Sequence, residues 1–230
     1  MKSLMLKFTG PMQSWAQDSR YRTREAGTAP TKSGVLGLLA AAQGRRRCDP
    51  VEDLAKLEFG VRVDQPGTLE RDYQTAYIAQ EKKTQPSYRY YLADAVFLTA
   101  VAGEDTLIQD LEAAVRSPSF PLFLGRRSCP ANWDLLLGIR EGGVEQVLAE
   151  EPWQAASWYR RRQPRKVSLA TYRDARPGEA GDDACDVPIS FNPENRQYAW
   201  RRVVEGSVCL PNPEGCDVPQ DPFLEAVRVP

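Results

Sequence analysis

The segment at residues 30–42, PTKSGVLGLLAAA, constrains the fold more than any other part of this 230-residue chain. From Val35 onward it is apolar on every side, which is typical of a helix buried in a core and not of an amphipathic surface helix. Thr31 is suited to be the N-cap, because its hydroxyl can accept a hydrogen bond from the amide of Ser33 or Gly34. The segment therefore predicts a central buried helix.

The first turn of this helix has two interpretations. Its free backbone N–H groups, together with Lys32, the hydroxyl of Ser33 and the bare backbone of Gly34, suit an oxygen anion such as a phosphate. Alternatively, the small residues only allow close packing of a buried helix. Capped helices are more common than phosphate sites, so the helix start by itself does not decide between the two.

The first 140 residues are predicted to contain strands and helices in the order β-α-β-β-α-β. The strands are expected at residues 4–8, 58–64, 93–102 and 135–139, and the helices at 31–44 and 105–115. This order is that of the ferredoxin-like (RRM-like) fold, which is shared with RNA-recognition modules. We therefore predict an α+β protein with a ferredoxin-like βαββαβ domain at residues 1–150.

A short second helix is predicted from a capping box, with Asp49 as N-cap, Pro50 at N1 and Glu52 at N3. After Pro152 the chain breaks into short segments rich in proline and glycine, with little helical period. We expect residues 151–230 to form a small β-rich C-terminal domain.

A long inserted β-hairpin is expected at about residues 68–95, with a polar tip at 80–86. Aromatic side chains are dense near its base, where Tyr73, Tyr77, Tyr88, Tyr90 and Tyr91 accompany Arg89. Rings that point outward would stack on the splayed bases of a single strand. Rings that face one another across the strands would serve the packing of the hairpin instead.

The loop at residues 125–128, GRRS, places a flexible backbone, two guanidinium groups and a hydroxyl next to one another. Arginine can bind a phosphate with two parallel hydrogen bonds, so this grouping suits a nucleic-acid backbone. An exposed turn with solvated charges is the alternative.

The net charge of the chain is −1, but the charges are unevenly distributed. Residues 20–47 contain seven basic side chains against Glu25 alone, and residues 153–173 contain six basic side chains and no acidic one. The tail from Glu205 onward is acidic. This pattern fits a face that contacts RNA or DNA, backed by an acidic surface. Ordinary solvated charge is the alternative.

The chain contains no histidine, and its five cysteines form no C-x-x-C pair. Both facts argue against a zinc site and a disulfide framework, and we expect neither a metal nor a cofactor. Without histidine, an acid or base that works near neutral pH would have to be a carboxylate, Lys, Tyr or Cys. The sequence has no apolar run of about 18 residues, and its first residues are too charged for a signal peptide, so we expect a cytoplasmic protein without a membrane partner.

Several blocks of the sequence resemble one known family. They are GPMQSW at 10–15, TR at 23–24, PTKSGVLGLL at 30–39, RDY at 71–73, YLADA at 91–95 and LGRRSCP at 124–130. In order and spacing they are similar to the CasD family, which are subunits of Cascade, the type I-E CRISPR surveillance complex. That family belongs to the RAMP superfamily of ferredoxin-like RNA-binding proteins.

The resemblance implies a role in binding a guide RNA. Such a protein caps the 5′ handle of the processed crRNA, uses the hairpin as a thumb that kinks the RNA, and joins the backbone subunit to the large subunit that recognises foreign DNA. Target DNA within the complex is a further candidate partner. The RNA-binding residues implied in this chain are Gln13, Trp15, Arg24, Lys32, Ser33, Gly34, Tyr73, Arg89, Gly125, Arg126, Arg127 and Ser128.

The lack of histidine bears on catalysis. Type I-C relatives of this family are metal-independent ribonucleases that use a Tyr-Lys-His set, which this chain cannot complete. We therefore expect a non-catalytic subunit with no catalytic residue. The alternatives are an endoribonuclease that processes CRISPR repeat RNA with Tyr and Lys alone, and a generic single-strand RNA binder outside any complex.

Overall fold

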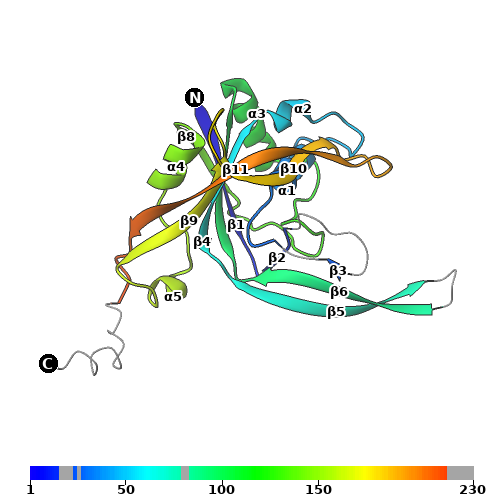
Figure 1. Ribbon diagram of the computed structural model, residues 1–230, viewed down its shortest axis with the longest axis horizontal. Helices are drawn as coiled ribbons and strands as arrows, with labels where there is room; N and C mark the ends of the chain where they lie inside the picture. The colour runs from blue at the N-terminus through cyan, green and yellow to red at the C-terminus, as the bar shows by residue number, and fades with distance from the viewer. Residues whose placement is uncertain (16–22, 25–26, 79–82, 217–230) are drawn as a thin grey trace.

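The helix predicted after Thr31 is present as α1 (Lys32–Ala42), on one side of the sheet (Figure 1). The computed structural model describes residues 1–15, 23–24, 27–78 and 83–216. The Thr31 hydroxyl accepts a hydrogen bond from the Gly34 amide at 3.2 Å, so the predicted N-cap is confirmed. Apolar side chains along α1 are buried, as its all-round apolar sequence predicts.

Seven strands form one antiparallel sheet in the order β10-β11-β9-β4-β7-β1-β8. They are β1 (Lys2–Thr9), β4 (Glu58–Gln65), β7 (Val96–Gly103), β8 (Leu136–Glu141), β9 (Lys166–Asp174), β10 (Asp182–Ser190) and β11 (Gln197–Pro211). Helix α1 follows β1, and α3 (Asp105–Arg116) follows β7. The structure is thus a mixed α/β protein, and the strands and helices predicted in the first 140 residues are present.

Both faces of the central strands are covered. In β1, Leu4, Leu6 and Phe8 belong to the core shared with α1 and α3, whereas Met5 packs against α4 (Val144–Glu150) on the other face. Successive side chains of a strand point to opposite faces, so a strand covered on both sides has little polar alternation. This explains why LMLKF reads as a nearly continuous apolar run.

The second helix, α2 (Glu52–Ala55), begins later than expected. Its N-cap is Val51, and no side chain caps it. Asp49, the predicted N-cap, accepts a hydrogen bond from the Arg46 amide at 2.6 Å instead. The capping-box prediction is therefore wrong, because the preceding turn uses the carboxylate that the box requires.

Strands β9, β10 and β11 extend the sheet of the first 150 residues. Strand β9 pairs with β4, and the long β11 pairs with β10 along its first half and with β9 along its second half. Strand β10 thereby lies over α1 and α2 (Figure 1). The predicted domain boundary near residue 150 does not interrupt the sheet, and the division into two folding units stays a prediction.

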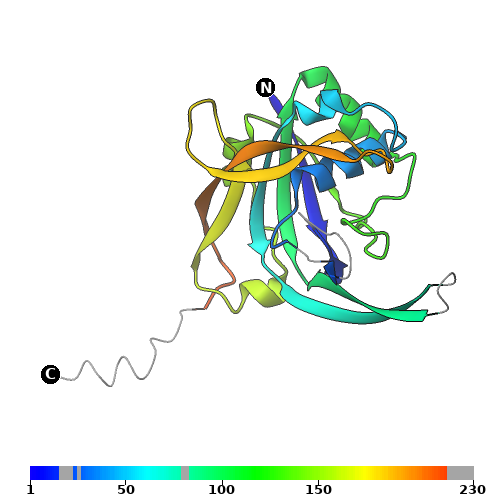
Figure 2. The same cartoon turned by 45° about the vertical axis from the view of Figure 1, so that its right-hand side comes forward.

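Strands β5 (Thr68–Ile78) and β6 (Lys83–Ala93) form a hairpin that projects from the body of the protein (Figures 1 and 2). The short strands β2 (Met12–Gln13) and β3 (Thr23–Arg24) pair with the other edge of β6. Strand β6 begins at Lys83, so the predicted tip at residues 80–86 is too long. Residues 79–82 lie outside the described part of the chain.

Candidate nucleic-acid interface

Three segments that are far apart in the sequence meet at the base of the hairpin. They are the residues after β2, the end of β6 and the loop after Leu124. Ser14 contacts the other two, because its amide donates to Leu124 O at 3.1 Å and its hydroxyl donates to Tyr90 O at 3.2 Å. Arg126 also donates to Tyr90 O, at 3.2 Å. The loop is therefore fixed against the hairpin.

The loop at residues 125–128 depends on Gly125. Its φ is +84°, and a Cβ atom at this position would lie 1.9 Å from Ser14 O. Glycine alone avoids both the strained φ and this overlap. Leu124 N donates to Cys129 O at 2.7 Å and closes the loop. The close approach of the two backbones explains why glycine stands here.

Tyr91 lies beneath this loop and is almost fully buried. The guanidinium carbon of Arg126 lies 4.9 Å from the centroid of its ring, a cation–π contact. Burial raises the pKa of Tyr91, but hydrogen bonds with Ser128 and Arg126, the charge of Arg126 and a hydrogen bond with Arg89 lower it more, so the pKa lies below its ordinary value. The local environment thus favours negative charge.

The outer side of the loop is accessible. Gly125, Arg127 and Ser128 are exposed, and Arg126 and Arg89 are half-buried. The structure therefore brings together the predicted loop residues and the predicted arginine of β6, with hydrogen-bond donors from both sides of one small surface. We call these five residues the loop–hairpin site.

Aromatic side chains line the opposite face of the hairpin, because Tyr73 and Tyr88 alternate along their strands with Asp72 and Arg89. Tyr73 and Tyr88 are opposite each other in the β5–β6 register, with ring centroids 5.5 Å apart, and Arg71 lies 5.4 Å from the centroid of Tyr88. Tyr73 and Tyr77 nevertheless remain 59% and 67% exposed. Both interpretations of the tyrosines hold in part, because the rings pack across the strands and still present aromatic surface to solvent.

Gln13 and Trp15 are buried, which corrects the expectation that their side chains contact RNA. Trp15 Nε1 donates to Gln13 Oε1 at 2.9 Å, and Gln13 Nε2 donates to Ala95 O at 2.8 Å. The Trp15 ring packs against Phe8, with centroids 5.1 Å apart. These two buried side chains anchor the segment that carries Ser14, and Ser14 in turn holds the loop against the hairpin.

The start of α1 is already bound to carboxylates of the same chain. The ammonium group of Lys32 pairs with Asp174 at 2.8 Å, and the Lys32 amide donates to Asp186 at 2.7 Å. Arg201 bonds both carboxylates, with its Nη1 2.8 Å from Asp174 and its Nε 2.6 Å from Asp186. The helix start does attract an anion, as predicted, but that anion is a carboxylate of β10. The expectation that Lys32 contacts RNA is therefore not supported by its surroundings.

The remaining predicted residues differ in position. Gly34 packs under the Trp15 ring, where a Cβ atom would lie 3.0 Å from the ring, and Ser33 is half-buried beside it. The backbone of Arg24 pairs with that of Arg89 in the β3–β6 ladder, and the Arg24 side chain lies outside the described residues. The helix start thus borders the loop–hairpin site through Trp15.

Sequence reasoning missed two parts of this arrangement. Nothing in the sequence marked Ser14 as important except its place between Gln13 and Trp15 in the GPMQSW segment. The sequence also gave no sign that Lys32 would meet Asp174, Asp186 and Arg201. These residues lie about 140 to 170 positions away and reach the helix start only because the sheet folds back over α1.

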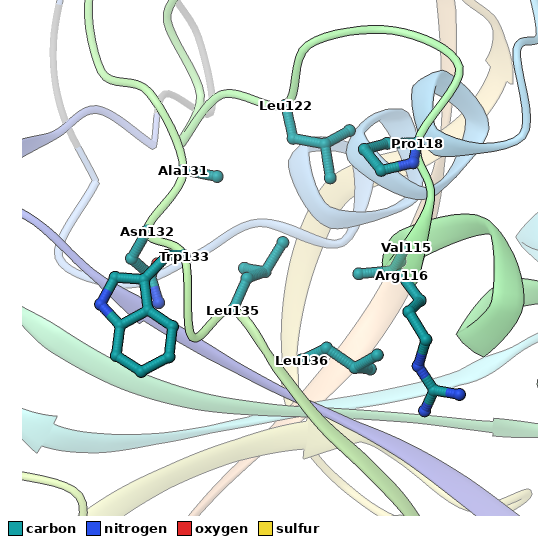
Figure 3. A pocket seen from close by; sticks show the side chains of 9 residues that line it. All are labelled: Val115, Arg116, Pro118, Leu122, Ala131, Asn132, Trp133, Leu135 and Leu136. Carbon is teal, nitrogen blue, oxygen red and sulfur yellow. The ribbon is translucent and has the colours of Figure 1, made fainter.

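A hollow in the surface lies away from this site. It has a volume of about 390 Å³ and lies between the end of α3 and residues 131–136 (Figure 3). Trp133, which is 96% exposed, stands on one side of it and Arg116 on the other. None of the predicted RNA-binding residues lines it. The loop–hairpin site is thus a surface and not this pocket.

Two further observations concern the described part of the chain. Among residues 1–15, 23–24, 27–78 and 83–216, no three Cys, Asp or Glu side chains are grouped so that they could hold a metal ion. No helix within the same ranges is long and apolar enough to cross a bilayer.

Comparisons with known proteins relate this geometry to one family. The family described as "CRISPR-associated protein (Cas_Cas5)" matches residues 3–204. The "CRISPR system Cascade subunit CasD" of Escherichia coli (strain K12) is 38% identical over 172 residues, which cover 65% of this chain and 77% of that relative.

Two solved structures are similar over nearly the whole chain. A chain of a "CRISPR RNA-guided surveillance complex" has a TM-score of 0.77 and 28% identity, covering 98% of both chains. A "Crystal structure of Cas protein" has a TM-score of 0.72 and 34% identity, covering 95% of this chain and 100% of that one. The sequence blocks, the fold and these matches agree, and the chain belongs to the CRISPR-associated Cas5 family.

Proposed function

We propose that this chain is the non-catalytic Cascade subunit that binds and caps the 5′ handle of the crRNA and joins the backbone subunit to the large subunit. Membership of the family supports a place in a CRISPR surveillance complex. The order β4-β7-β1-β8, with helices after β1 and β7, supports a ferredoxin-like assignment for the first domain.

The observation that carries the proposal is the meeting of the loop at residues 125–128 with the hairpin base. Arg126, Arg127 and Ser128 supply donors that match phosphate oxygens, and the positive surroundings that lower the pKa of Tyr91 favour an anion there. The exposed rings of Tyr73 and Tyr77 lie along the same hairpin and provide stacking surfaces for unpaired bases. Phosphate contacts on one side and stacking on the other suit a bent single strand.

Arg127→Ala is expected to weaken binding of a 5′-handle RNA by about 1–2 kcal/mol, as the loss of one charge-assisted phosphate contact. Arg127 is exposed, so this change is expected to leave the packing of the protein intact. Fluorescence anisotropy with a labelled handle RNA measures the effect. Arg116→Ala, at an exposed arginine at the end of α3, is the matched control and should bind as the unmodified chain does. Equal affinity in both variants would refute the site.

A second function rests on Tyr91. A tyrosine with a lowered pKa beside two arginines is suited to accept the proton of a ribose 2′-hydroxyl, as an endoribonuclease requires. However, Tyr91 is almost fully buried, and the chain has no histidine to protonate the leaving oxygen. We therefore favour binding without cleavage.

We expect the chain to leave a labelled CRISPR-repeat RNA intact in a metal-free buffer. Tyr91→Phe is the diagnostic variant, because it removes the hydroxyl and keeps the ring under Arg126. Specific cleavage by the unmodified chain that disappears in Tyr91→Phe would establish the ribonuclease and overturn the binding-only proposal. Denaturing gel electrophoresis of the RNA is the measurement.

The hairpin is the proposed thumb that contacts the backbone subunit. Isolation of the chain from its native cells, with sequencing of bound RNA, tests this and the capping role together. We expect short RNAs that share one fixed 5′ sequence and several co-purifying subunits. Heterogeneous RNA, or the chain without partners, would instead support a generic single-strand binder.

A further inference from the structure

A second cationic and aromatic surface lies on α5 (Ser157–Arg160) and the turn that follows it. Trp158, Arg161, Arg162 and Lys166 are all exposed there. We call these four residues the α5 surface. None of them belongs to the loop–hairpin site.

Trp158 is held in place by a row of aromatic rings. Its ring makes an edge contact with Tyr159, at 5.8 Å between centroids, and Tyr159 makes one with Trp153 at 6.2 Å. Trp153 is buried, and its Nε1 donates to Asp64 O at 2.8 Å, at the end of β4. Trp158 is therefore supported from the core, yet it remains 50% exposed. A fixed and exposed indole is a stacking platform that needs little ordering when a ligand binds.

Two of the three cations lie on the same side of this short helix as Trp158. Arg161 and Arg162 follow Trp158 by three and four residues, and the helical turn continues through both, since Arg161 N donates to Ser157 O at 3.0 Å. The guanidinium carbon of Arg162 lies 5.6 Å from the Trp158 centroid. Lys166 begins β9 directly after the turn.

Little negative charge offsets these cations. The sequence from residue 153 to 173 contains no carboxylate, and within the described part of the chain the acidic side chain that reaches α5 is Glu214. Glu214 pairs with Arg160 at 2.5 Å and more loosely with Arg161, at 3.7 Å. Arg162 and Lys166 add positive charge beyond that pairing, so the α5 surface is positive on balance.

We propose that the α5 surface binds single-stranded nucleic acid, with one base stacked on Trp158 and the flanking phosphates held by Arg161, Arg162 and Lys166. An indole with a stacked arginine and further cations on the same side matches the aromatic platforms and electrostatic grooves that bind single strands. Trp and Arg are also common in protein interfaces, but the lysine and the net positive charge of this surface favour a phosphate backbone.

The α5 surface adjoins the hairpin. The Ala156 amide donates to Gln65 Oε1 at 3.2 Å, and β5 starts three residues after Gln65. Figure 2 shows α5 beside the start of β5. A strand bound at α5 would therefore lie close to the hairpin base, and both RNA and DNA single strands carry the chemistry that the surface recognises.

The test uses the full chain and labelled 12-nucleotide strands of mixed sequence that lack any handle sequence, once as RNA and once as DNA. Anisotropy titrations are run on Trp158→Ala/Arg161→Ala in a background of Arg126→Ala/Arg127→Ala, so that the loop–hairpin site cannot contribute. We expect about a tenfold loss of affinity relative to that background, and a weaker salt dependence of binding. Trp158→Phe, which keeps an aromatic ring, should recover part of the loss.

The matched control is Trp200→Ala/Arg202→Ala. These residues are also an exposed tryptophan and arginine, on β11, and Arg202 is as loosely paired with Asp183, at 3.9 Å, as Arg161 is with Glu214, at 3.7 Å. This variant should bind as its background does. Preference for the DNA strand would assign the surface to target or displaced DNA, and preference for RNA would assign it to the guide.

The proposal fails if the Trp158→Ala/Arg161→Ala variant keeps the affinity of its background while its thermal midpoint is unchanged. It also fails if the loss equals that of the β11 control. Neither result would bear on the handle site, because the Arg127→Ala measurement with a handle RNA is made separately.

Discussion

Lys32→Met is expected to lower the free energy of unfolding by about 3 kcal/mol and to leave the intrinsic affinity for a handle RNA unchanged. The side chain of Lys32 is only 6% exposed, and its ammonium group pairs with Asp174, which is 20% exposed. Removal of one partner of a buried pair costs about 3–5 kcal/mol. We expect the lower end of this range, because Asp174 still accepts hydrogen bonds from Arg201 Nη1 at 2.8 Å and from the Phe59 amide at 3.0 Å after Lys32 is replaced. Urea unfolding at neutral pH measures the change.

Lys7→Met is the matched control for this prediction. Lys7 pairs with Asp134 at 2.7 Å, but the two side chains are 19% and 29% exposed, so we expect a loss of about 1 kcal/mol or less. If Lys32→Met kept its stability and lost handle affinity, the phosphate interpretation of the helix start would be correct after all. RNA binding is measured at a temperature at which both variants are fully folded.

Gly125→Ala is expected to displace the loop at residues 125–128, with at least a tenfold loss of handle affinity. An alanine would be held at a φ of +84°, which costs about 1–2 kcal/mol for a residue with a Cβ atom. Its Cβ would also overlap Ser14 O, at 1.9 Å, so the loop and the segment that carries Ser14 must separate. Fluorescence anisotropy with handle RNA measures the loss of affinity, and thermal unfolding measures the loss of stability.

Gly178→Ala separates the effect of the strained φ from the effect of the overlap with Ser14. Gly178 has the same φ of +84°, but no atom lies within 4 Å of the position of its Cβ. It should therefore show the backbone strain without the overlap, and normal RNA binding. Equal losses of stability in the two variants would mean that the contact with Ser14 has no energetic consequence and that the loop is not fixed as described.

The local features of this protein are determined by its sequence. The apolar run after Val35 and the Thr31 cap predict α1, and the structure has the helix and its cap hydrogen bond. The polar segment at residues 80–86, between two strand-like segments, predicts the hairpin, which is present as β5 and β6. Each of these depends on residues within a few positions of one another, so propensity, periodicity and capping are sufficient to predict them.

The candidate site also has a part that the sequence could predict. The arginines and serine at residues 125–128 lie together because they are consecutive, and Gly125 indicates a backbone that only glycine can adopt. Asp49 shows the limit of such local rules, because two hydrogen-bonding patterns competed for one carboxylate and the turn at Arg46 formed. Short-range patterns do not rank such competitors.

The tertiary structure alone decided which charges meet. The lysine at the start of α1 looks free in the sequence, but β10 folds over the helix and brings Asp186 to its amide, while β9 brings Asp174 to its ammonium group. Likewise Ser14 joins the loop to the hairpin only because the sheet places the ends of β2 and β6 together. The sequence determined the elements and their chemistry. Long-range strand pairing decided their neighbours, because a partner more than a hundred residues away leaves no trace in the local pattern.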